Sequence, residues 1–281
     1  MPPVKKPSKW DAVKQTVQQV LRIKNGWSFS RYAVYALCPA QARYKFIDKI
    51  PEASSRPMER GSLIHKQAEC YIKGLTCPVL NDDPDVALPK LGRDGSIPAG
   101  TAMHRKGVLP PPLAKFADLF KEQAALYKKK AVIQSVEDSW AFTKDWESCS
   151  PTDWDRCWVR IKVDRAYEVA GKVLIIRDWK TGRFHDDLHE EYLKAIQLYA
   201  LGGLLKYPHI KKVKPFLDYL DAGCTHPEEP LEYDRSDIPK LKKIWEDRVT
   251  PMFNDGIFAP RPNSKCTWCS YGASKGGPCK Y

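Results

Sequence analysis

The sequence predicts an α/β fold in which a mixed sheet is flanked by helices. Residues with helical spacing precede a group of β-forming runs, and helical spacing returns between and after these runs. Two of the runs, 157–169 and 172–179, are separated only by Ala170 and Gly171, which is typical of a tight hairpin. The chain contains no repeat or linker that would split it, so we expect a single domain over 1–281.

Each expected element follows from its own pattern. Apolar residues at intervals of three and four, preceded by capping residues such as serine, predict the helices. Runs of Val, Ile and aromatic residues bounded by turn residues predict the strands. We expect helices at 10–24, from Ser28 or Ser30 to Cys38, from Gly61 onward, at 113–130, at 188–206 and at 236–253. We expect strands near 132–143 and at 157–169, 172–179 and 214–221.

Three stretches fall outside this pattern. Residues 1–27 form an N-terminal helical extension in this interpretation. Between 77 and 112 the chain is rich in Pro, Gly and Asp and has no periodicity, which indicates an irregular insertion. The last stretch, 254–281, is rich in cysteine and glycine.

The charge of the chain favours a nucleic-acid partner. The formal net charge is +12, and lysine and arginine side chains that neutralise phosphates gain affinity by releasing counterions. Basic soluble proteins without such a partner are also common, so the charge indicates nucleic-acid binding only if the chain also contains a suitable site. The sequence has no apolar stretch of about 20 residues and no secretory signal, so we expect a cytoplasmic protein with no membrane contact.

The run KVLIIRDWKTG, residues 172–182, ends in two charged side chains. Asp178 and Lys180 are two residues apart and therefore project from one face of a strand. If the hairpin turns near residues 170 and 171, Asp164 on the partner strand lies opposite Asp178. Two carboxylates so placed suit Mg²⁺ or Mn²⁺, and the lysine could stabilise charge on a phosphoryl group. A surface ion pair at a strand end is the alternative.

Other polar side chains have spacings that suit a site. His65 and Glu69 are four apart in an expected helix and can face one point. Gln197 lies on the helix that follows the strand. His185 and His189 also have a helical metal spacing, but acidic neighbours at a helix N-terminus favour a structural role for that segment.

These residues resemble a known family. The motifs G-S-L-I-H at 61–65, V-D-R at 163–165, I-R-D-W-K-T-G at 176–182 and I-Q-L-Y-A-L at 196–201 are similar to those of the RecB-type branch of the PD-(D/E)xK nucleases. The resemblance covers about 28–281, and D-W-K-T-G is its strongest motif. It implies a restriction-endonuclease-like mixed sheet and a nuclease activity.

The resemblance also implies roles for individual residues. It assigns the divalent metal to His65, Asp164, Asp178 and the main-chain carbonyl of Trp179, catalysis to Lys180, and support of the site or of DNA to Gln197. The family usually has a tyrosine four residues after this glutamine, whereas Tyr199 follows after two and lies about 200° around the helix. Participation of Tyr199 or Glu69 stays open.

The C-terminal segment carries a pattern that indicates metal binding. Cys266 and Cys269 form a C-x-x-C unit, and Cys279 follows after nine residues that include three glycines. Tetrahedral zinc or a four-iron cluster requires a fourth ligand. The iron–sulfur members of the resembled nucleases combine three such cysteines with one N-terminal cysteine, which implies Cys38 here. We therefore expect a [4Fe–4S] cluster that staples the two ends of the domain, with zinc as the alternative.

Taken together, the sequence predicts a metal-dependent DNA nuclease. An exonuclease that acts on single strands or duplex ends, in recombination, repair or phage DNA metabolism, is the first hypothesis, because the sequence has no module for base readout. One alternative is a non-catalytic nucleic-acid binding protein with structural zinc. Another is a structure-selective endonuclease within a larger complex.

Overall fold

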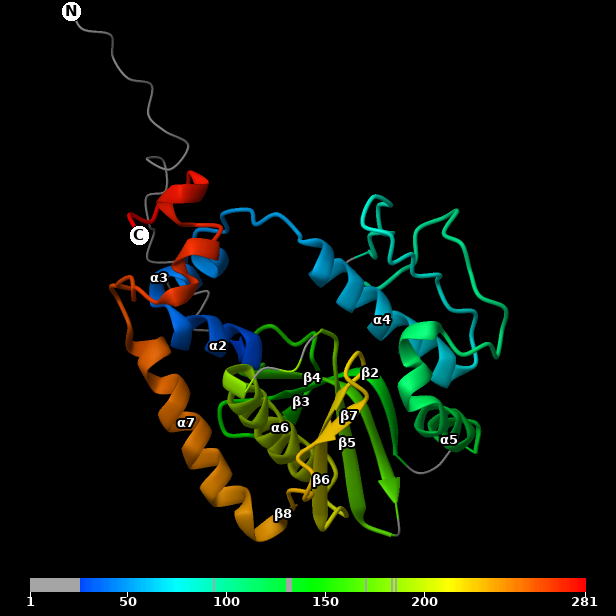
Figure 1. Ribbon diagram of the computed structural model, residues 1–281. Helices are drawn as coiled ribbons and strands as arrows, with labels where there is room; N and C mark the ends of the chain where they lie inside the picture. The colour runs from blue at the N-terminus through cyan, green and yellow to red at the C-terminus, as the bar shows by residue number, and fades with distance from the viewer. Residues whose placement is uncertain (1–25, 93, 130–132, 170, 183, 185) are drawn as a thin grey trace, which may run out of the picture.

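A mixed sheet lies at the centre of the computed structural model, which describes residues 26–92, 94–129, 133–169, 171–182, 184 and 186–281 (Figure 1). Its main strands follow the order β3-β2-β4-β5-β6-β7, with β1 paired to β4 and β8 paired to β6. The strands are β1 (Trp27–Ser28), β2 (Gln134–Phe142), β3 (Ser148–Cys149), β4 (Val159–Val169), β5 (Val173–Lys180), β6 (Lys212–Tyr219), β7 (Cys224–His226) and β8 (Tyr233–Asp234).

Helices cover this sheet. The N-terminal part contributes α2 (Phe29–Leu37), α3 (Pro39–Ala42) and a π-helical turn (Arg43–Ile47). The others are α4 (Arg56–Lys73), α5 (Ala117–Lys128) after a 3₁₀ turn (Pro111–Phe116), α6 (Asp186–Lys206) and α7 (Ile238–Asn254) after a 3₁₀ turn (Arg235–Asp237). Two further 3₁₀ turns, Ser264–Trp268 and Ala273–Lys275, lie in the C-terminal segment. The prediction of an α/β mixed sheet flanked by helices is confirmed.

The sheet is mixed because its connections differ in length. A tight turn joins β4 to β5, and these strands pair antiparallel from Val169↔Val173 to Arg165↔Arg177. The helix α6 joins β5 to β6. This crossover returns the chain to the end of the sheet at which β5 began, so β6 runs in the same direction and the two strands pair in parallel. The expected helix at 10–24 lies outside the described residues.

Helix α4 begins earlier than the sequence pattern suggests. The pattern places its start at Gly61, but the helix begins at Arg56, with Pro57 in its first turn, where the missing N–H of proline costs no hydrogen bond. Gly61 is therefore inside the helix. A Cβ atom at this position would lie 2.9 Å from Oγ1 of Thr181, so glycine lets α4 approach the turn that follows β5.

Helix α6 packs closely on one face of the sheet through a pair of glycines. A Cβ atom on Gly202 would lie 2.6 Å from Cδ1 of Ile161, and one on Gly203 would lie 2.6 Å from Cδ2 of Leu174. The same face carries the largest hydrophobic cluster, which α2 and α7 complete. A smaller cluster joins α4 and α5 to Trp179 and Val136.

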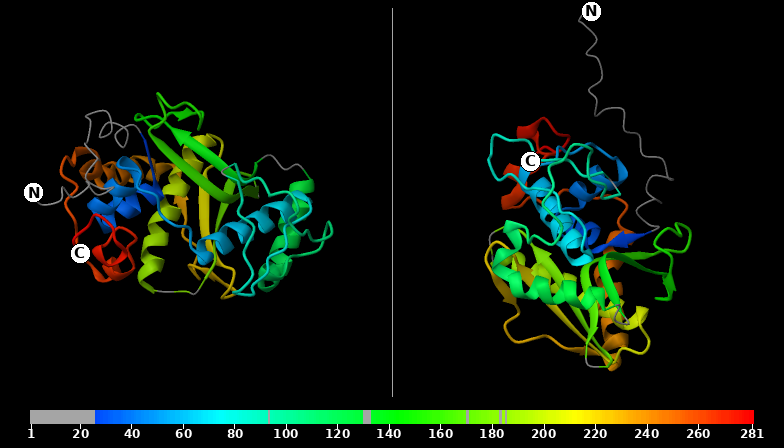
Figure 2. Two further views of the ribbon diagram at one scale, coloured as in Figure 1. Left: turned by 90° about the horizontal axis from the view of Figure 1, so that it is seen from above. Right: turned by 90° about the vertical axis from the view of Figure 1, so that its right-hand side faces the viewer.

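The segment between α4 and the 3₁₀ turn at Pro111 has no helix or strand among its described residues apart from a single bridge between Pro78 and Met103. Figures 1 and 2 place these loops beside α4, at the opposite end of the molecule from the C-terminus. Within the described ranges, no helix combines the length and the apolar character needed to cross a membrane.

Helices α2 and α3 lie beside the C-terminal segment in Figures 1 and 2. The guanidinium of Arg261 donates a hydrogen bond to the carbonyl of Ala36, and the backbone N–H of Arg261 lies 3.4 Å from Sγ of Cys38. Tyr35 also donates a hydrogen bond to Asp255, just beyond α7. These contacts join the N-terminal helices to the C-terminal segment.

The close approach of α6 to the sheet gives a stability prediction. The substitution Gly203→Val should lower the free energy of unfolding by about 1–3 kcal/mol, because the added carbons overlap Leu174. Gly256→Val is the control, because a Cβ atom there meets nothing within 4 Å, and its effect should stay within about 0.5 kcal/mol. Urea denaturation of both variants measures the difference, and equal values would contradict this packing.

Candidate active site

The candidate site forms where β4 and β5 separate. Their ladder ends at Arg165↔Arg177, so Asp164 and Asp178 are the next residues on the two strands. Only 8% of Asp164 and 4% of Asp178 is exposed. Oδ2 of Asp164 accepts a hydrogen bond of 2.7 Å from the backbone N–H of Trp179. The carboxylate of β4 thus holds the end of β5 at the point where sheet hydrogen bonding stops.

Lys180 lies beside the second carboxylate, as their spacing of two residues predicts. Its ammonium forms an ion pair with Asp178 and lies 4.2 Å from the centre of the Tyr192 ring on α6. Burial alone would lower the pKa of Lys180, but the charges of Asp178 and Asp164 outweigh burial and raise it. The lysine is therefore a fixed positive charge at this site.

Helix α4 supplies the histidine. Nε2 of His65 lies 3.0 Å from the carbonyl oxygen of Trp179, and Nδ1 lies 3.4 Å from Oδ1 of Asp164. The Trp179 ring is buried against Phe120 of α5 and meets the His65 ring edge-on. Packing of this tryptophan therefore fixes both the end of β5 and the imidazole.

An ion-pair network attaches α4 to the turn after β5. Arg60 makes two hydrogen bonds to the carboxylate of Asp221, of 2.8 and 3.1 Å. Oδ2 of Asp221 also accepts a hydrogen bond of 2.7 Å from the backbone N–H of Gly182. Together with the absent side chain at Gly61, this network holds His65 close to β5.

Glu137 is a site residue that the sequence analysis missed. On β2 it falls between Val136, which pairs with Arg165, and Asp138, which pairs with Val163, and so lies opposite Asp164. Its Oε1 is 3.0 Å from Nδ1 of His65. The connection between β2 and β4 is long. Only the pairing register of these two strands, which the sequence does not give, could have identified this glutamate.

The pKa values reflect a concentration of negative charge. Burial alone would lower the pKa of His65, but Asp164 and Glu137 outweigh burial and raise it to about 10. Burial raises the pKa of Asp178 to about 6, and the charge of Asp164 adds to this effect. Burial alone would also raise the pKa of Asp164, but His65 and Lys180 hold it below its usual value. Such a site attracts a cation.

The donor set fits a hard divalent cation. His65, Glu137 and Asp164 each offer a ligand atom, and these atoms lie within 4.8 Å of one another. Adjacent ligands of an octahedral Mg²⁺ are about 3 Å apart. That spacing matches the 3.0 Å between Nε2 of His65 and the carbonyl oxygen of Trp179. Carboxylate, carbonyl and imidazole donors also suit Mn²⁺.

Two further residues of α6 have different surroundings. Oε1 of Gln197 accepts a hydrogen bond of 2.7 Å from Arg248 on α7, so the structure turns this side chain toward α7. Tyr199 instead lies near the carboxylates: burial raises its pKa well above the usual value, and the charges of Asp178 and Asp164 add to the shift. The site role expected for Gln197 stays a prediction.

The other candidates from the sequence do not add to this site as described. Glu69 forms ion pairs with Lys66 and Lys73 on its own helix. His185 and the side chain of His189 lie outside the described residues.

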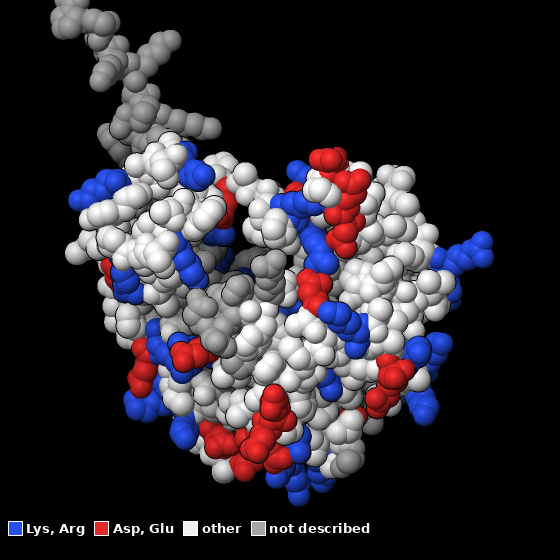
Figure 3. Space-filling model, in the orientation of Figure 1, with Lys and Arg blue, Asp and Glu red and all other residues white. Residues whose placement is uncertain are grey.

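A hollow of about 880 Å³ opens beside His65 and Glu137. It is lined by residues between 58 and 69 of α4, by residues 89–92 and 94–95 of the irregular segment, and by Ser139 and Lys162 of the sheet. On the face drawn in Figure 3, basic and acidic side chains are interspersed, and the surface is hollowed near its upper centre. The net positive charge is therefore not gathered into one patch on this face.

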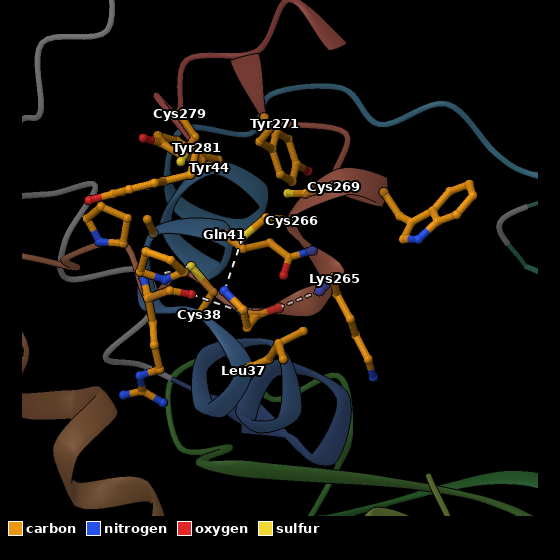
Figure 4. Close-up of a pocket in the computed structure, with 17 residues that line it drawn as sticks. Leu37, Cys38, Gln41, Tyr44, Lys265, Cys266, Cys269, Tyr271, Cys279 and Tyr281 are labelled. Carbon is orange, nitrogen blue, oxygen red and sulfur yellow. Dashed lines mark hydrogen bonds between the residues drawn. The ribbon is translucent and has the colours of Figure 1, made fainter. Parts of the chain in front are cut away.

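The four cysteines singled out by the sequence line one cavity, of about 170 Å³. Figure 4 shows Cys38, at the junction of α2 and α3, together with Cys266, Cys269 and Cys279 of the C-terminal segment. Burial raises the pKa of Cys269, and the other three thiols add to this shift. Backbone N–H groups point at two of the sulfurs, since that of Asn263 lies 3.3 Å from Sγ of Cys266 and that of Arg261 approaches Cys38.

Comparisons with known proteins complete this description. The comparison with curated proteins gave no match. Two solved structures are similar: SSO0001, at 13% identity and a TM-score of 0.34 over 90% of each chain, and a protein from Eubacterium rectale named "Putative exonuclease", at 12% identity and a TM-score of 0.42 over 92% of each chain. At these TM-scores neither similarity supports an argument about activity.

The family comparison is decisive because it covers most of the chain. The model of one nuclease superfamily matches residues 26–274, a range that includes both the carboxylate site and three of the four clustered cysteines. The chain belongs to the PD-(D/E)XK nuclease superfamily.

Proposed function

We propose that this protein is a divalent-metal-dependent DNA nuclease whose catalytic groups are Asp164, Asp178 and Lys180. Membership of the superfamily supports nuclease chemistry, divalent metals and a DNA substrate. The observation that carries the assignment to these residues is the meeting of two buried carboxylates and one ammonium where β4 and β5 separate.

Each residue has a role that follows from its position. His65, Asp164, Asp178 and the carbonyl of Trp179 would hold the ion. When bound, Mg²⁺ or Mn²⁺ lowers the pKa of a coordinated water and neutralises charge on the phosphate. Lys180, fixed by Asp178, would orient the attacking water and stabilise the negative charge that develops on the phosphate oxygens.

The hollow beside His65 supports an exonuclease that receives a strand end. It is bounded by α4, by the irregular segment and by the sheet, so a strand that enters it is enclosed on three sides. Lys66, Lys90 and Lys162 line it; each is paired with a glutamate of the same hollow and would have to exchange that partner for a phosphate. A free end reaches such a place more easily than an internal segment of duplex.

The cysteine cavity supports the iron–sulfur branch of the superfamily. Four cysteines from the two ends of the domain line it, and four thiolates are the ligand set of a [4Fe–4S] cluster. The N–H···S contacts made to Cys38 and Cys266 are of the kind that cluster sulfurs accept.

Removal of the lysine tests the catalytic assignment. Lys180→Ala should reduce Mg²⁺- or Mn²⁺-dependent DNA cleavage by about 10²- to 10³-fold, because the transition state loses a preorganised positive charge. The control is Lys121→Ala on α5, a side chain that is 62% exposed and should leave the rate within about twofold. Circular dichroism checks that both variants fold. Full activity in a folded Lys180→Ala protein would favour a non-catalytic binding protein.

The mode of cleavage can be tested with one sequence in two forms. End-labelled linear single-stranded DNA should release short products from its ends, whereas the same strand closed into a circle should persist. Linear duplex with free or blocked ends extends the comparison. Cutting of the circle at the rate of the linear strand would contradict an exonuclease and favour the structure-selective endonuclease.

The cluster assignment gives a prediction that does not depend on cleavage. Protein purified without oxygen should be brown and contain about four irons and four sulfides per chain. Cys266→Ser should abolish the colour, whereas Cys149→Ser, which changes a free cysteine of β3 outside the cavity, should keep it. A colourless protein with one zinc per chain would overturn the iron–sulfur assignment.

A further inference from the structure

Glu137 has a backbone conformation that its position in a strand does not explain. Its φ is +52°, in the left-handed region that costs a non-glycine residue free energy. Residues on either side of it pair regularly with β4, so the departure is confined to Glu137, which lies opposite Asp164. Strain of this kind persists only where the surroundings require it, which points to the side chain.

The side chain of Glu137 is held by two contacts. Oε1 lies 3.0 Å from Nδ1 of His65, and Oε2 lies 2.6 Å from Nζ of Lys162. The glutamate side chain is only 10% exposed, whereas that of Lys162 is 65% exposed. The carboxylate is therefore buried against the imidazole on one side, and on its solvent side it is paired with Lys162.

The two nitrogens of the His65 ring face different groups. Nδ1 faces the carboxylate of Glu137 at 3.0 Å and, farther away, that of Asp164 at 3.4 Å, whereas Nε2 faces the carbonyl oxygen of Trp179 at 3.0 Å. An imidazole binds a metal through a nitrogen that carries no proton, and the hydrogen bond made by the other nitrogen decides where the proton sits. A carboxylate that accepts the Nδ1 proton leaves Nε2 as the nitrogen that can ligate an ion, which would replace the proton that Nε2 donates to the Trp179 carbonyl.

We propose that Glu137 is a positioning residue that holds His65 in the orientation and tautomer required to ligate the divalent ion through Nε2. This inference rests on the proposed metal site and adds a residue to it. Glu137 is one of the three residues whose ligand atoms lie within 4.8 Å of one another. However, its Oε1 faces His65 and its Oε2 is paired with Lys162, so it acts through the imidazole while Lys162 balances its charge.

Manganese binding to the full-length protein, measured by calorimetry without DNA, tests this role. The variant Glu137→Gly removes the carboxylate and also relieves the positive φ, so its melting temperature should not fall below that of the wild type. Its Mn²⁺ affinity should fall by about 10- to 100-fold, as is typical when the hydrogen-bond partner of a ligating histidine is lost. A merely structural glutamate would give neither result.

Two matched variants separate the contacts of Glu137. Glu137→Gln keeps an oxygen that can accept the Nδ1 proton and should retain more Mn²⁺ affinity than Glu137→Gly. Lys162→Met removes only the outer ion pair and should change the affinity by less than about threefold, since a pair with one exposed partner contributes little.

Each outcome discriminates. Wild-type Mn²⁺ affinity in a folded Glu137→Gly protein would overturn the role of Glu137 and leave the proposed metal site intact. Equal losses in Glu137→Gly and Glu137→Gln would overturn positioning in favour of direct ligation by the carboxylate. A wild-type protein that binds no Mn²⁺ would overturn the metal site itself, and the role of Glu137 with it.

Discussion

The hydrogen bond from the Trp179 N–H to the buried carboxylate of Asp164 is the constraint on which the site depends. It replaces the sheet bond that β4 and β5 no longer make beyond Arg165↔Arg177. Because the N–H of Trp179 is held toward β4, its carbonyl is available to His65, and the residues on either side, Asp178 and Lys180, are fixed on one face of the strand. One short bond at the end of a hairpin thus orients the Trp179 carbonyl and the side chains of Asp178 and Lys180.

The histidine reaches this strand end because α4 can approach it closely. A side chain at Gly61 would meet Thr181, and the pair formed by Arg60 and Asp221 holds the turn at Gly182 against the helix. The glycine and the histidine of G-S-L-I-H are one helical turn apart and lie on the same side of α4. Gly61 allows α4 to lie close to the end of β5, and at that distance His65 reaches the Trp179 carbonyl. The motif was expected to start a helix, but it lies inside α4 and forms the part of the helix that contacts the end of β5.

The part of the site that depends on local geometry was predictable, and the part that depends on long connections was not. A hairpin with a short turn fixes its own register, so counting from residues 170 and 171 placed Asp164 opposite Asp178. Glu137 is joined to β4 through a long connection, and counting residues across such a connection does not give the register between the two strands. The roles on α6 depend on rotation about its axis. Apolar residues lie on several sides of this helix, so its sequence could not decide whether Gln197 or Tyr199 faces the carboxylates.

The cysteine cavity bears on the carboxylate site through the chain that leads into α4. The cavity is built from the two ends of the domain, and its C-terminal half also contacts the segment between the π-helical turn and α4: Tyr271 donates a hydrogen bond to the carbonyl of Ile50, and Ser270 donates one to Glu52. This segment ends where α4 begins, nine residues before His65. Ligation of four cysteines by one centre would therefore restrain the start of the helix that carries the histidine. The two proposed centres, although separate in space, would then be mechanically linked. The loss of one ligand cysteine would loosen the start of α4 and so alter the position of His65.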